Sequence, residues 1–345
     1  MKKIAFLDYL RFCAIIAVII IHCTPIDSMD FNSFEWKYNL PFNALSRFGV
    51  PLFFMISGAL FLNPEKKTDF NYLKSKIVRI IICFFVFSLF YDILWYLNKY
   101  GFSLEREAIL NVFIPNLITG KYHLWYLAAI ISLYLLTPIL KAFANDLKIL
   151  KYYILILFIV CSVIPSLYHL LQLLGDYSFL ETISQNMALN LPAYSIYFVL
   201  GYYLSNVSIE RISNRIKILW LGIVFLLLFM ISGDYVQSYL LKVPSIMFSG
   251  YLSPLTIVYS SLIFVIARIK IREKTSNIVV RLVANYSLGI YLIHALFIDF
   301  LRTFGFLPVR VLPLIVIPII VVIVLLISMG ATYIMKRINY FNRIL

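Results

Sequence analysis

The sequence contains few charged residues and few cysteines. Only 13% of its 345 residues are Asp, Glu, Lys or Arg, whereas soluble domains contain about 25%. This shortage excludes a soluble globular protein. The four cysteines lie within apolar runs and form no CxxC pair, so we expect neither a disulfide framework nor a zinc site. The chain also lacks internal repeats and linkers, which predicts one membrane domain over residues 1–345 with no appended soluble domain.

Long hydrophobic runs fill most of the chain. Hydrophobic residues make up 62% of it, and the mean hydropathy is +0.92. A helix that spans a bilayer needs about 20 apolar residues. The sequence therefore predicts an all-α, multi-pass integral membrane protein with about ten transmembrane helices. Their expected ranges are 4–24, 42–62, 77–97, 122–141, 150–168, 190–206, 215–233, 248–268, 284–302 and 310–335.

The basic residues are distributed unevenly between the two sides of these helices. An even number of spans places both termini on one side, and that side holds 21 of the 30 Lys and Arg residues. The positive-inside rule then predicts that both termini are cytoplasmic. The formal charge of +14 is explained by this topology and by contact with anionic membrane lipids, so no nucleic-acid partner is expected.

The first predicted span, "LDYLRFCAIIAVIIIHC", carries an Asp, an Arg and a His. Charged residues inside a membrane are costly and usually face the protein interior or a wet cavity. Arg11 and His22 are 11 residues apart, which on a helix returns to within about 20° of the same direction after a rise of roughly 16 Å. Asp8 lies three residues before Arg11, at a spacing where helical side chains meet. One helix face thus offers an ion pair near its inner end and an imidazole near its outer end.

Polar residues of other predicted spans point to the same volume. They occur in "RFGVPLFF" of the second span, "KYHLWYL" of the fourth and "YSLGIYLIH" of the ninth, where the polar residues follow one helical stripe. We expect these residues on the acceptor side or lining a cavity: Arg47, His123, Trp125, Ser287, Tyr291 and His294. The alternatives are membership of the aromatic belt for Trp125 and simple interhelical hydrogen bonding for the stripe.

Four blocks together resemble the acyltransferase-3 family of multi-pass membrane enzymes. These blocks are "LDYLRFCAIIAVIIIH", "VPLFFMISGALF", "HLWYLAAIISLYLLTPIL" and "SLGIYLIHALF", in the order found in that family. Within the family, the chain is most similar to stand-alone O-acetyltransferases of surface polysaccharides such as enterobacterial common antigen. The fourth-span block reads "HLWYLAAI", whereas some relatives have the form "WSLxxE". The role that the Glu of that form has in those relatives is therefore assigned to no residue of this chain.

This resemblance implies a bacterial inner-membrane enzyme. It would transfer an acyl group, by default acetyl, from cytoplasmic acyl-CoA to a hydroxyl of an extracytoplasmic surface polysaccharide or its lipid-linked precursor. The acyl-CoA is a substrate, and no bound cofactor is implied. His22 would act as the general base or carry the acyl group covalently, with Asp8 and Arg11 in the catalytic set.

The resemblance also implies where the donor binds. Lys76 and Arg79 match a basic pair common in the family and, with Arg11, would hold the phosphates of coenzyme A. The alternative for this pair is positive-inside topology alone.

Two other functions stay open at this point. Buried His, Arg and Asp residues would equally suit a transporter or flippase of a glycan or lipid-linked intermediate. However, no inverted repeat with broken helices is visible in the sequence. A non-catalytic member of a polysaccharide-synthesis machinery is the third possibility, although it would not need Arg11 and His22 on one face.

Overall fold

The computed structural model describes residues 5–26, 29–66, 69–103, 105–171, 192–271, 275–309 and 311–345, and in these ranges every regular element is a helix. The expected all-α, multi-pass membrane architecture is confirmed. Eight helical segments of the described residues are long and apolar enough to cross a bilayer. They are Ala5–Cys23, Phe34–Phe61, Phe70–Tyr100, Trp125–Ala142, Leu147–Leu171, Ile216–Leu241, Ile278–Thr303 and Pro313–Met335.

These segments correspond to the following labelled helices. They are α1 (Ala5–Cys23), α2 (Phe34–Ser46), α3 (Gly49–Phe61), α4 (Phe70–Tyr100), α7 (Trp125–Ala142), α8 (Leu147–Phe158), α9 (Ile164–Leu171), α13 (Ile216–Leu241), α15 (Ile278–Thr303) and α16 (Pro313–Met335). A π-helical segment, Ile159–Val163, joins α8 to α9. The remaining helices are α5 (Arg106–Ala108), α6 (Ile114–Thr119), α11 (Ser195–Asn206), α12 (Glu210–Ser213), α14 (Pro254–Lys270) and α17 (Asn339–Ile344).

The structure differs from the expected count of ten spans at two places. The predicted spans 190–206 and 248–268 correspond to α11 and α14, which contain 12 and 17 residues. At about 1.5 Å per residue these helices are roughly 18 and 26 Å long, less than the ~30 Å hydrocarbon core. Residues 190 and 191 lie outside the described residues. Both short helices pack against other helices. Their apolar side chains are therefore covered by protein, whereas a hydropathy criterion assumes that they face lipid.

Helix starts are set by short polar side chains ahead of the apolar runs. The Asp69 carboxylate accepts a hydrogen bond from the backbone N–H of Tyr72 (2.8 Å) and caps α4. The Asn277 side chain accepts from the N–H of Val279 and caps α15. Such caps satisfy backbone donors that have no partner within the helix. The start of α4 at this cap places Lys76 and Arg79 in its second and third turns.

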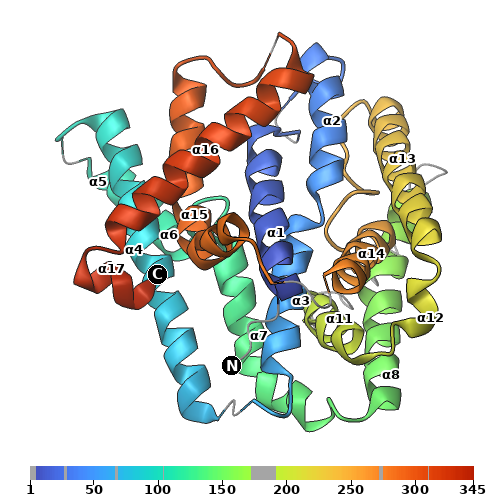
Figure 1. Ribbon diagram of the computed structural model, residues 1–345. Helices are drawn as coiled ribbons and strands as arrows, with labels where there is room; N and C mark the ends of the chain where they lie inside the picture. Colours follow the sequence, from blue (N-terminus) through green and yellow to red (C-terminus); the bar gives the residue numbers. More distant parts are fainter. Residues whose placement is uncertain are drawn as a thin grey trace.

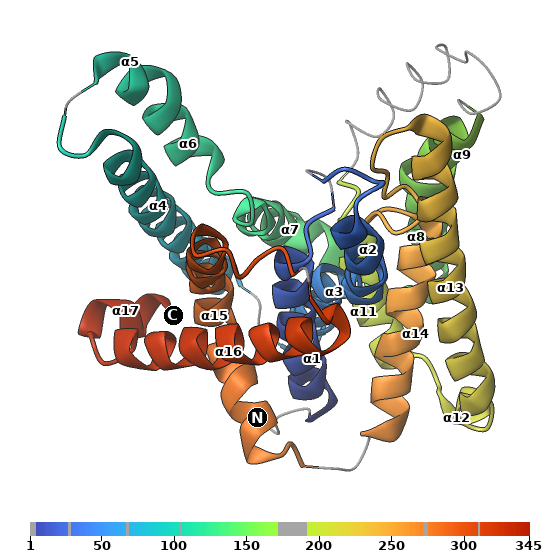
Figure 2. The same ribbon diagram turned by 90° about the horizontal axis from the view of Figure 1, so that it is seen from above.

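Helix α1 lies at the centre of the molecule. Figures 1 and 2 both show it with α4, α15 and α17 on one side and α8, α11, α13 and α14 on the other, while α16 crosses it. It contacts α2, α3, α14, α15 and α16. The polar residues of α1 are therefore surrounded by protein, which is how a membrane protein accommodates them.

The closest helix crossing joins α3 to α11 through two glycines. A Cβ atom on Gly58 would lie 1.7 Å from the carbonyl oxygen of Phe198, and one on Gly201 would lie 1.9 Å from that of Met55. Only glycine permits this backbone approach. Small residues commonly allow such close packing of helices in membranes.

We expect Gly201→Ala to destabilise the protein by about 1–3 kcal/mol, because the new methyl group must push α3 and α11 apart. Gly330→Ala in α16 is the control, since a Cβ there meets nothing within 4 Å. Thermal unfolding in detergent, followed by fluorescence-detected size exclusion, measures both variants. Equal unfolding temperatures would contradict the proposed role of the crossing.

The sidedness of the helices stays a prediction, and cysteine labelling tests it. Ser75 in α4 and Ser103 beyond its other end are both exposed. In a background freed of native cysteines, Ser75→Cys should react with an impermeant thiol reagent only after the membrane is opened. Ser103→Cys should react in intact cells. The reverse pattern would place the termini outside the cytoplasm.

Candidate functional site

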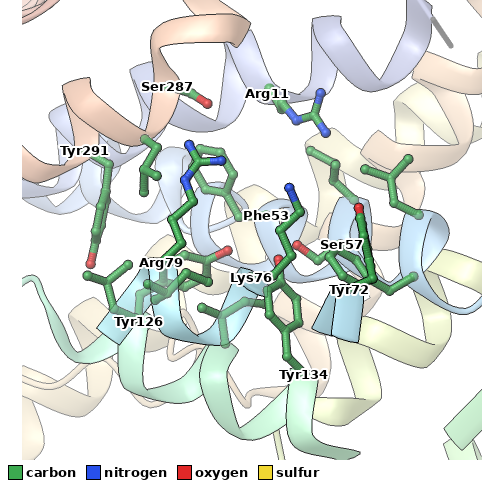
Figure 3. Close-up of a pocket in the computed structure, with 17 residues that line it drawn as sticks. Arg11, Phe53, Ser57, Tyr72, Lys76, Arg79, Tyr126, Tyr134, Ser287 and Tyr291 are labelled. Atoms are coloured by element: carbon green, nitrogen blue, oxygen red, sulfur yellow. The ribbon is translucent and has the colours of Figure 1, made fainter. Parts of the chain in front are cut away.

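A cationic pocket of about 320 Å³ lies between α1, α3, α4, α7 and α15. Its lining includes Arg11, Lys76 and Arg79, and Figure 3 shows their charged ends directed towards one another across the pocket. Ser287 and Tyr291 of α15 complete the lining on one side. The structure thus brings the three expected donor-binding cations together with two residues of the polar stripe. Such a pocket suits a ligand with several negative charges.

A polar network holds Arg11 at this pocket. The Nη1 atom of Arg11 lies 3.4 Å from Oδ1 of Asp8. The other carboxylate oxygen of Asp8 accepts a hydrogen bond from Ser276 (3.2 Å). Arg281 in turn donates to the carbonyl oxygen of Ser276 (3.2 Å). Asp8 therefore neutralises and orients Arg11. Asp8 does not line the pocket itself, so its role is to support Arg11 from behind the pocket wall.

Arg79 links the pocket to the C-terminal helix. Its Nε donates to the carbonyl oxygen of Ile344 in α17 (2.7 Å), which leaves the Nη groups to face the pocket. The ammonium group of Lys76 lies 5.2 Å from the ring centre of Tyr72. Just outside the spans, burial and then the positive charge of Arg11 lower the pKa of Lys66. Positive charge is therefore concentrated at this end of α1.

The pocket also contains hydroxyl groups that the sequence analysis did not select. Ser57, Tyr72, Tyr126 and Tyr134 all line it. Tyrosines in a membrane protein are usually attributed to the aromatic belt, so composition gave no reason to choose these. The only available signal was the spacing of Tyr126 and Tyr134, eight residues apart on one face of α7.

Three of the four histidines form a cluster at the other end of α1. The ring centres of His22 and His294 are 5.2 Å apart, those of His123 and His294 5.3 Å, and those of His22 and His123 6.3 Å. They come from three elements distant in sequence: α1, the turn before α7, and α15. A search of the described residues finds no group of His, Cys, Asp or Glu that could hold a metal ion.

The hydrogen bonds of His294 define which of its nitrogens carries hydrogen. Its Nδ1 lies 2.7 Å from the carbonyl oxygen of Tyr291 and 3.2 Å from that of Ile290. Carbonyl oxygens only accept, so Nδ1 is the donor and Nε2 of the neutral ring carries a lone pair. That Nε2 atom is buried without a hydrogen-bond partner among the described residues. His294 therefore presents a proton acceptor to the cluster.

A charged network lies beside the histidine cluster. Asp299 pairs with Lys121 (3.1 Å) and with Arg302 (3.2 Å). Arg302 also donates to the backbone carbonyl oxygen of His22 (2.7 Å). These contacts join the end of α1, the turn before α7 and α15, which are the three elements that supply the histidines. Sequence reasoning missed this network because Lys121 is distant in sequence from Asp299 and Arg302 of α15.

Tyr291 separates the two regions. It lines the cationic pocket, its hydroxyl donates to the backbone carbonyl of His123, and its ring lies 5.7 Å from that of His123. The lining of this pocket includes Tyr291 but none of the three clustered histidines, so the expected cavity that continues from Arg11 to His22 stays a prediction.

The two other expected residues lie beside the histidine cluster, outside the cationic pocket. Arg47 follows α2, is 6% exposed, and its guanidinium carbon lies 5.2 Å from the ring centre of Tyr251. Trp125 is the first residue of α7 and packs against Tyr194 and Tyr251, with ring centres 5.3 and 5.7 Å apart. Trp125 thus belongs to an internal aromatic group rather than to an isolated belt position.

Comparison with characterised sequences gives similarity to polysaccharide-related membrane proteins. The chain is 26% identical over 319 residues to the "Probable poly-beta-1,6-N-acetyl-D-glucosamine export protein" of Staphylococcus aureus (strain NCTC 8325 / PS 47), covering 87% of this chain and 84% of that protein. The protein of the same name from strain MRSA252 is 25% identical over the same length and coverage. No solved structure matches the chain.

A shorter similarity involves a protein with a different name. The "Serine/alanine racemase" of Enterococcus gallinarum is 28% identical over 136 residues, which cover 36% of this chain and 18% of the racemase. Over residues 4–333 the chain matches the family model described as "Acyltransferase domain". This match includes both the cationic pocket and the histidine cluster, and the chain belongs to the acyltransferase-3 family of multi-pass bacterial inner-membrane proteins.

Proposed function

We propose that the protein is an O-acyltransferase that moves a short acyl group, by default acetyl, from cytoplasmic acyl-CoA to a hydroxyl of an extracytoplasmic polysaccharide or its lipid-linked precursor. One observation supports this proposal. Helices α1 and α15 both contribute residues to the cationic pocket and, further along each helix, to the histidine cluster. Anionic phosphates of the donor suit the first region. Proton transfer near neutral pH suits the second.

The roles follow from this arrangement. Arg11, Lys76 and Arg79 bind the donor phosphates, and the acyl-pantetheine arm extends along α1 towards His22. The roughly 16 Å between the levels of Arg11 and His22 is comparable with the length of that arm. Because Tyr291 stands between the two regions, its side chain must rotate aside for the thioester to reach the histidines.

The chemical step exchanges one acyl bond for another. His22 removes the proton of the acceptor hydroxyl as the oxygen attacks the thioester carbonyl. The carbon–sulfur bond breaks and the ester carbon–oxygen bond forms. The coenzyme A thiolate leaves and regains a proton, which restores His22. His294 lies beside His22, with 5.2 Å between the ring centres, and its Nε2 atom is available as a second proton acceptor.

The names of the relatives support a second candidate, export of a polysaccharide. They also support a poly-N-acetylglucosamine type of glycan as the polymer involved, whereas the sequence motifs favour an acceptor such as enterobacterial common antigen. Transporters often contain inverted repeats with broken helices, and the sequence shows no such corresponding halves. We therefore place acyl transfer first.

Radiolabelled acetyl-CoA distinguishes the two functions. Inverted membrane vesicles containing the protein and the strain's de-O-acylated surface polysaccharide should yield labelled, alkali-labile glycan. Vesicles without the protein should not. Movement of unlabelled glycan with no acyl transfer would replace the proposal with export.

A further inference from the structure

We infer that Arg47, Trp125, Tyr194 and Tyr251 form the binding site for the acceptor sugar, in which a pyranose ring packs on aromatic faces and its oxygens accept hydrogen bonds from Arg47. This inference rests on the proposed acyl transfer and defines where its second substrate binds.

The state of Arg47 is the first observation. The residue is 6% exposed, and its guanidinium makes no hydrogen bond or ion pair with any of the described residues. Its packing over Tyr251 does not replace these bonds. Leaving buried donors of a charged group unsatisfied costs several kcal/mol. An oxygen-rich ligand would satisfy them.

The unpaired donor indicates what that ligand has to supply. The buried Nε atom of Arg47 has no hydrogen-bond partner among the described residues, so the ligand has to supply hydrogen-bond acceptors. Sugar hydroxyl and N-acetyl oxygens meet this requirement.

The aromatic group is the second observation. The ring of Trp125 lies 5.3 Å from Tyr194 and 5.7 Å from Tyr251, and all three side chains are partly exposed. Partly exposed rings with a polar edge suit the apolar C–H face of a sugar.

Position relative to the histidines is the third observation. Asn43, one turn before Arg47, donates to the carbonyl oxygen of Thr24 (2.8 Å) at the end of α1 that carries His22. Trp125 follows His123 by two residues. A sugar on the aromatic group would therefore extend its hydroxyls towards the cluster where the acyl group arrives.

Steady-state kinetics of acetyl transfer, with de-O-acylated surface polysaccharide from a strain lacking the gene as the probe, test this inference. Tyr194→Leu, Tyr251→Leu and Arg47→Gln should each raise the KM for polysaccharide at least tenfold. The KM for acetyl-CoA should change less than twofold. Trp95→Leu and Arg106→Gln are matched controls outside the site and should leave both constants unchanged.

The outcomes separate this inference from the proposed function. An unchanged polysaccharide KM in the two tyrosine variants would overturn the acceptor site while leaving acyl transfer intact. If Arg47→Gln fails to fold by size exclusion, the tyrosine variants decide. If the unmodified protein transfers nothing, the proposed function fails and the acceptor site fails with it.

Discussion

His22→Ala should reduce acyl transfer by about 10²- to 10⁴-fold, the usual contribution of a positioned general base. His22 is the member of the histidine cluster carried by the central helix, and its backbone carbonyl is held by Arg302. Removal of its imidazole leaves the acceptor hydroxyl without a base, whereas the apolar contacts of α1 persist. Initial rates with radiolabelled acetyl-CoA measure the loss.

The control for this experiment is the fourth histidine. His169→Ala changes a residue of α9, which has no part in the cluster, and should retain the unmodified rate. Both variants should express and elute equally on size exclusion. Unmodified transfer by His22→Ala would remove His22 from the mechanism and direct attention to His294, whose Nε2 presents a lone pair.

The sequence predicted the helical membrane architecture because span length and apolar content follow directly from bilayer thickness. The sequence predicted only some of the residues that line the cationic pocket with Arg11. Lys76 and Arg79 could be selected because they match a basic pair common in the family that the sequence resembles. Tyr126 and Tyr134 could not, since tyrosine has many ordinary positions in membrane proteins.

Long-range packing explains the remaining differences. Asp299 and Arg302 meet at an i,i+3 spacing within α15, whereas Lys121 reaches Asp299 only because the folded chain brings α15 to the turn before α7. The short lengths of α11 and α14 depend on burial against other helices, which a hydropathy window does not represent. The position of Tyr291 likewise results from the contact of α15 with His123 in the turn before α7.

Arg11→Lys should weaken acyl-CoA binding roughly 10- to 100-fold, although the positive charge is retained. A lysine loses the planar fork that binds a phosphate at two points, and hydrogen bonds to charged groups contribute about 1.5–3 kcal/mol. It also loses the geometry that Asp8 and Ser276 hold in place at the pocket. Titration calorimetry with coenzyme A measures the change in affinity.

The comparison of three variants shows whether charge or geometry matters. Arg343→Lys, in the exposed part of α17, should bind coenzyme A as the unmodified protein does. Asp8→Asn keeps the Arg11 fork but removes its charged partner, so it should weaken binding less than Arg11→Lys. If Arg11→Lys binds and transfers normally, charge alone suffices at this position, and Lys76 and Arg79 provide the specific phosphate contacts.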